Sequence, residues 1–86
     1  MPQHVPQRPY WNGDPERLRD AFRMTKQKGD RTLAAVCEVW SHQFGWELKL
    51  MIDGRGLHLS SVVRSVDEMH ATINQWRAEM QPLGWQ

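Results

Sequence analysis

The chain has 86 residues, a formal net charge of +1 and a single cysteine, Cys37. This length limits the chain to one domain, and one cysteine excludes an internal disulfide framework. The sequence has no apolar run near the roughly 18 residues of a membrane span and no apolar run in its first thirty residues. We therefore expect a cytoplasmic protein in a reducing compartment.

The charges are distributed unevenly but sparsely. Residues 1–31 hold seven basic and four acidic side chains, whereas residues 32–86 hold four basic and six acidic ones. The first third is therefore mildly basic, without the dense basic patch that is typical of a nucleic-acid-binding surface.

The first residues predict an arm without regular structure. Residues 1–13 contain Pro2, Pro6 and Pro9, each of which lacks a backbone N–H and restricts the residue before it. We interpret residues 1–13 as a proline-rich flexible arm and residues 14–86 as a single α+β domain with its core at 31–85.

A helix is predicted after the arm. Asp14 is a suitable N-cap and Pro15 suits the first helical position, while Gly29 is typical of a helix end. Between them a narrow stripe recurs at helical spacing: Leu18, Ala21, Phe22 and Thr25. We expect this short amphipathic helix to be the weakest element of the fold.

Residues 31–42, 46–53 and 57–64 alternate between apolar and polar side chains, which predicts three strands with one buried face. A loop at residues 42–45 would pair Trp40 with Glu47, Glu38 with Lys49, and Val36 with Met51. A two-residue turn at Gly54 would pair Ile52 with Leu57 and Met51 with His58. Both registers gather the apolar positions on one face, so they predict an antiparallel meander.

The last third predicts a second helix. Ser65 and Glu68 form a capping box in which the hydroxyl accepts from the Glu68 N–H and the carboxylate returns to the Ser65 N–H. One apolar stripe follows: Val66, Met69, Ile73, Trp76 and Met80. The predicted fold is therefore a helix, a three-stranded meander and a C-terminal helix packed on one sheet face, in the order α-β-β-β-α.

No residues converge as catalysis or metal binding requires. Cys37 is expected to point into the core, where a thiol is inert. His42, His58 and His70 fall on a loop, a sheet face and a helix surface, with no spacing typical of metal ligands. The sequence therefore predicts no enzyme, no catalytic residue, no metal site and no cofactor.

The open sheet face is the candidate interaction surface. It is expected to carry an unusual mixture of apolar and charged side chains: Val36, Trp40, Lys49, Met51, His58, Val62 and Arg64. An apolar patch with a charged rim is typical of an interaction site. The N-terminal helix, a second copy of the chain or a different protein are three ways to cover it. Our leading hypothesis is a small non-enzymatic protein-interaction or regulatory protein, and a homodimer is one form of it.

The alternative hypothesis is a nucleic-acid-binding module that uses the arm and the basic side chains of the first helix: Arg17, Arg19, Arg23, Lys26 and Lys28. The element order is similar to that of the double-stranded RNA-binding domain. The second helix of that family opens with lysines, whereas Val66, Asp67 and Glu68 stand here, so we reject that family.

Residues Trp40 to Leu50, read Trp-Ser-His-Gln-Phe-Gly-Trp-Glu-Leu-Lys-Leu, carry a further resemblance. Together with Gly84-Trp85 near the end of the chain, this segment resembles a group of short uncharacterised bacterial proteins. The resemblance covers residues from about 33 to 85. It implies a shared strand pair and C-terminal helix, and it implies no activity.

Overall fold

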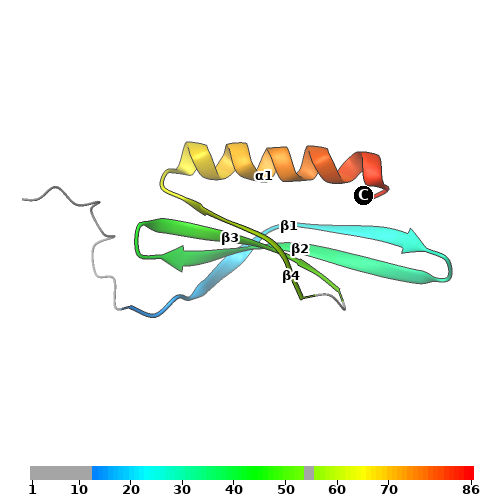
Figure 1. The fold of residues 1–86 in the computed structure, drawn as a ribbon, viewed down its shortest axis with the longest axis horizontal. Coiled ribbons are helices and arrows are strands. Elements are labelled where there is room, and N and C mark those ends of the chain that lie inside the picture. The colour runs from blue at the N-terminus through cyan, green and yellow to red at the C-terminus, as the bar shows by residue number, and fades with distance from the viewer. Residues whose placement is uncertain (1–12, 54–55) are drawn as a thin grey trace, which may run out of the picture.

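The computed structural model describes residues 13–53 and 56–86. Four strands, β1 (Arg17–Lys28), β2 (Arg31–His42), β3 (Gly45–Ile52) and β4 (Gly56–Val63), form one antiparallel meander in the order β1-β2-β3-β4. The helix α1 (Val66–Met80) and a short 3₁₀ helix, η1 (Gln81–Leu83), follow. Helix α1 lies across one face of the sheet (Figure 1). Among the described residues, no helix is long and apolar enough to cross a membrane.

The prediction of an N-terminal helix is wrong, because residues Arg17–Lys28 form strand β1. The buried residues Phe22 and Met24 alternate with exposed Arg23 and Thr25, which is the period of a strand. Two register shifts against β2, between Arg17 and Arg19 and between Asp20 and Phe22, break this alternation in the first half of the strand. A bulge adds one residue and displaces the side chains that follow, so the apolar positions imitate helical spacing.

Gly29 belongs to a tight turn and not to a helix end. It has a φ of +63° and, together with Asp30, joins β1 to β2. The pairing of Lys28 with Arg31 at this turn continues to the other end of the hairpin, where Arg17 pairs with Trp40. Strand β1 therefore satisfies its backbone by pairing with β2, which outweighs a modest local preference for helix.

The register predicted between the second and third strands is confirmed. As predicted, Val36 pairs with Met51, Glu38 with Lys49, and Trp40 with Glu47. The connection is shorter than expected, because His42 pairs with Gly45 and only residues 43–44 lie between them.

The register predicted near the second turn is wrong. Met51 pairs with Leu57, and Ile52 pairs with Gly56, after a shift that follows the Leu50–Leu59 pair. His58 is the additional residue of this β-bulge. The shift places Leu57 in the same row as Met51, on the face away from α1.

Helix α1 begins and packs as its sequence predicts, with one correction in the cap. The Ser65 hydroxyl accepts a hydrogen bond from the Glu68 N–H at 3.0 Å. The Glu68 carboxylate reaches the N–H of Arg64, at 3.3 Å, and not that of Ser65. Four residues of the predicted stripe are buried, namely Met69, Ile73, Trp76 and Met80, whereas Val66 is exposed.

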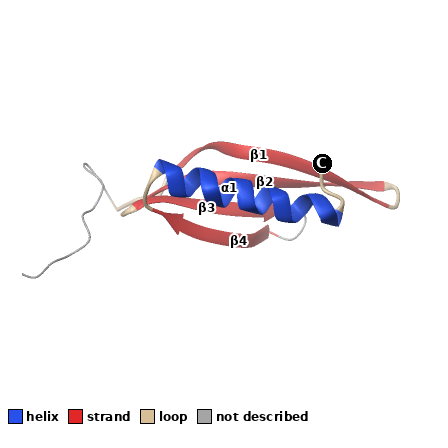
Figure 2. Ribbon diagram, turned by 90° about the horizontal axis from the view of Figure 1, so that it is seen from above, coloured by secondary structure: helices blue, strands red, loops and turns tan. Residues whose placement is uncertain are grey.

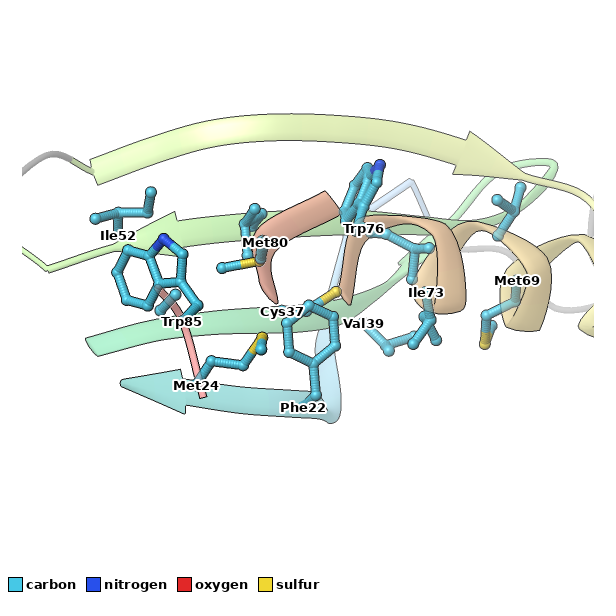
Figure 3. Close-up of a cluster of buried hydrophobic side chains, with 14 residues drawn as sticks. Phe22, Met24, Cys37, Val39, Ile52, Met69, Ile73, Trp76, Met80 and Trp85 are labelled. Carbon is cyan, nitrogen blue, oxygen red and sulfur yellow. The ribbon is translucent and has the colours of Figure 1, made fainter. Parts of the chain in front are cut away.

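The core lies between the sheet and α1. Side chains from the helix meet those of the sheet in one cluster, which includes Phe22 and Met24 of β1 (Figure 3). Its fully buried members come from the three following strands: Ala35, Cys37, Val39, Leu48, Leu50 and Val63. Strand β1 is therefore part of the core, which was predicted to start at residue 31.

The end of the chain returns to the sheet. Gly84 adopts a φ of +98° after η1, and Trp85 is buried in the core cluster. The Thr25 N–H donates to the Gln86 carbonyl at 2.8 Å, and the Gln86 N–H donates to the Thr25 carbonyl at 2.9 Å. These two bonds tie the segment after α1 to the outer edge of β1.

Candidate interaction surface

No element of the described chain covers the sheet face opposite α1. Figure 1 shows α1 on one side of the sheet and no described element on the other, and Figure 2 shows α1 in front of the strands. The predicted N-terminal helix was one of three possible covers for this open face. Because the residues assigned to it form β1, they extend the open face instead of covering it.

The registers arrange the open face in cross-strand rows. The first row contains Arg17, Trp40, Glu47 and Val62; the second contains Asp20, Glu38, Lys49 and Ser60; the third contains Arg23, Val36, Met51 and Leu57. Directly opposed side chains on one face lie close enough to interact. The open face therefore divides into a charged half, formed by the first two rows, and an apolar half.

The apolar half is a patch that we define by Ala34, Val36, Met51 and Leu57. Leu57 is 55% exposed, and the other three are half-buried. Val36 and Met51 also line a shallow hollow of about 530 Å³, with Arg23 and Glu38 among its other lining residues. The patch is thus a recess with charged groups at its border, which suits an apolar side chain of a partner.

The charged half is held together by direct contacts. The Arg17 guanidinium pairs with Asp20, and its Nε lies 3.0 Å from the Glu38 carboxylate. The other Glu38 oxygen accepts from the Trp40 indole N–H at 3.0 Å. The Lys49 ammonium lies 4.2 Å from the centre of the Trp40 ring. These contacts orient Trp40 and leave its ring covered by a cation.

The predicted surface residues are not all brought together. Val36 and Met51 belong to the apolar patch, whereas Trp40 and Lys49 belong to the charged half. Val62 ends the Trp40 row and is 40% exposed.

The last two predicted residues lie apart from that group. Arg64 lies at the end of the sheet, with its guanidinium 5.8 Å from the Phe44 ring centre. His58 lines hollows on the helix side together with Ile52, Leu83 and Trp85. The β-bulge explains this position, because it turns His58 and Leu59 to the same side.

Sequence reasoning missed several contributors to this surface. Leu57 was assigned to the buried face, because the bulge at His58 has no signal in an alternating pattern. Asp20 and the guanidinium of Arg17 were assigned to a helix. A plain strand alternation with Phe22 and Met24 would have placed Asp20 on the buried face, so only the register shift between Asp20 and Phe22 brings it to the open face.

The basic residues of β1 do not form one patch. Arg17 and Arg23 lie on the open face, where both are close to Asp20. Arg19 and Lys26 lie on the helix side, against the Met69 sulfur and the Trp85 ring. The alternative hypothesis assigned these residues to one helix, and that helix does not form.

The surroundings of Cys37 and His42 bear on whether the described residues could support catalysis or metal binding. Burial raises the pKa of the Cys37 thiol to about 11, so the thiol stays protonated at neutral pH. His42 accepts a hydrogen bond from the Phe44 N–H at 3.1 Å within its turn. Within residues 13–53 and 56–86, no group of three potential ligands is placed to hold a metal ion.

Fold and surface together define the class: a small α+β protein with a four-stranded meander, one covered face and one open face. Comparisons of the chain with protein-family models, with curated proteins and with solved structures find no match. The resemblance to short bacterial proteins therefore stays a prediction.

Proposed function

We propose that the chain is a small non-enzymatic interaction protein whose open sheet face binds another polypeptide. The observation that supports this proposal most directly is the apolar patch, which no described element covers. Burying such side chains on binding contributes roughly 25 cal/mol per Å² of apolar surface.

The neighbouring charged half of the open face indicates which kind of partner surface would be complementary. Arg17, Glu38 and Lys49 present both signs of charge in a fixed arrangement beside the patch. A matching surface needs apolar side chains for the recess and charges of both signs in register with these groups. A protein surface meets both needs, whereas a uniformly charged nucleic-acid backbone would be repelled by Asp20 and Glu38.

The proposal is tested with a double variant, Met51→Lys with Leu57→Lys. Both side chains lie on the open face, so the variant should remain folded while partner binding weakens by more than about tenfold. The partner is captured from native cells, purified, and titrated by calorimetry against the parent and the variant.

A matched control carries the same added charge on the exposed surface of α1, as Ala71→Lys with Asn74→Lys. This control should bind as the parent does. Equal affinity of parent and double variant, or loss of binding in the helix control, would contradict the assignment of the open face. If the captured partner is a second copy of the chain, the open face is a homodimer interface.

A further inference from the structure

The two edges of the sheet differ sharply in how they are protected. Edge strands expose unpaired N–H and C=O groups, and proteins normally block them with charges, proline, bulges or covering segments. Strand β1 carries five basic side chains and two register shifts, and the backbone of Gln86 pairs with it at Thr25. The β1 edge is therefore blocked by each of these means except proline.

Strand β4 has little of this protection. Its eight residues, Gly56–Val63, include no charged side chain and no proline. Its single register shift lies at one end, so pairing with β3 is regular from Leu59 to Val63. No other described segment pairs with its outer side. This strand also exposes three apolar side chains next to its unpaired outer backbone groups: Leu57, Leu59 and Val62.

We propose that the outer edge of β4 pairs with β4 of a second copy of the chain, antiparallel about a two-fold axis, giving a continuous sheet of four strands from each copy. This inference concerns the sheet edge and goes beyond the proposed function, which concerns the open face.

The composition of β4 is the reason for choosing a second copy as the occupant. In an isologous pair each residue near the axis lies opposite its own copy or a close neighbour, so a charge there would meet a like charge. The middle of β4 holds Ser60 and Ser61, which are small and uncharged. The bulge at His58 lies toward the end of each strand, so it leaves the central pairing regular.

The flanking residues complete the match. The regular segment ends in Leu59 on one side of the serines and in Val62 and Val63 on the other. Antiparallel pairing brings Leu59 of one copy beside Val63 of the other, because both side chains lie on the helix side of the sheet, and aliphatic and β-branched side chains pack well there. Both α1 helices would then lie on the same side of the joined sheet, and the two open faces would become one surface.

The first test measures the mass of the full chain by sedimentation between about 1 μM and 1 mM. The parent should form dimers, and Ser60→Lys should weaken the dimer by at least about tenfold, because the two added ammonium groups would lie at the axis or directly beside it. Ser60→Thr keeps an uncharged hydroxyl and a good strand former, so it should dimerise as the parent does.

The second test uses cysteine cross-linking. Ser60→Cys and Ser61→Cys are oxidised separately, because opposed residues in antiparallel strands lie about 4.5–5.5 Å apart between Cα atoms, within disulfide reach. At least one should yield a covalent dimer, while Thr25→Cys on the blocked β1 edge should not. The native Cys37 is buried and does not compete.

Three results would overturn the proposal. The first is a chain that stays monomeric over the whole range. The second is a dimer that survives Ser60→Lys but is lost in the Met51→Lys, Leu57→Lys variant. The third is protection from hydrogen exchange, in a monomer, of those β4 amides that point away from β3, because another segment of the chain would then pair there. The first and third results leave partner binding by the open face untouched, and the second would assign the dimer to the open face, so this proposal and the proposed function fail separately.

Discussion

At the scale of single residues, burial decides the chemistry of the only cysteine. Cys37 lies between Ala35 and Val39 on the inner face of β2, and all three side chains are almost inaccessible to solvent. Desolvation is the largest cause of its raised pKa, and the carboxylates of Asp20 and Glu38 act in the same direction. Arg19 opposes them without cancelling the effect of burial.

The raised pKa predicts a loss of stability at alkaline pH. Above about pH 9 the unfolded chain ionises its thiol, whereas the folded chain keeps the proton until about pH 11. The free energy of unfolding should therefore fall by about 2–3 kcal/mol as the pH rises from 9 to 11 and beyond.

Urea titrations at several pH values would measure this loss. Cys37→Ala is the control, since it is less stable at neutral pH but should show a flatter alkaline decline. Parallel declines of parent and control would show that other groups cause the pH dependence.

At the scale of elements, the turn between β2 and β3 depends on a close contact with β4. Gly45 has a φ of +151°, and a Cβ atom at this position would lie 2.3 Å from the Val63 carbonyl oxygen. Because the atoms nearest to the added Cβ belong to the backbone at the end of β4, they cannot move without disturbing the sheet. The glycine therefore lets the turn close against the end of β4.

Replacing this glycine should be costly. Gly45→Ala is expected to lower the free energy of unfolding by about 2–4 kcal/mol, through both the clash and the backbone conformation. Gly56→Ala is the matched control, since Gly56 has a φ of +70° but no atom within 4 Å of the added Cβ. Its cost should be about 1 kcal/mol. Chemical denaturation measures both, and equal losses would contradict the role of the close contact.

At the scale of the whole molecule, the segment after α1 closes the fold. Trp85 fills the end of the core beside Met24 and Ile52 (Figure 3), and Gln86 pairs with β1. The Lys26 side chain also passes over this segment, with its ammonium 6.0 Å from the Trp85 ring centre. The first and last described elements are thereby held together, which matters in a domain with a small core.

This closure makes Trp85 the sensitive residue of the tail. Trp85→Ala should cost about 3–5 kcal/mol in the free energy of unfolding, which is a large share of the stability of a small domain. Leu83→Ala, two residues earlier and 63% exposed, should change it by no more than about 0.5 kcal/mol. Thermal unfolding of the two variants gives the comparison, and similar melting temperatures would disprove the closing role of Trp85.

The sequence by itself determined the elements whose patterns are local and uninterrupted. Leu48, Leu50 and Ile52 alternate strictly, so the buried face follows from the period, and the short loop before them sets the β2–β3 register. The cap at Ser65 and the stripe from Met69 to Met80 are likewise complete within one segment. Such signals need no knowledge of the partner element.

Only the tertiary structure decided the rest, and bulges are the common physical reason. Strand β1 carries two register shifts that disguise its period, so its identity depends on pairing with β2. The bulge at His58 moved Leu57 to the open face and His58 to the helix side. A bulge is chosen by the match between two strands, which a single segment does not encode. The apolar patch and the unprotected β4 edge therefore became visible only in the assembled sheet.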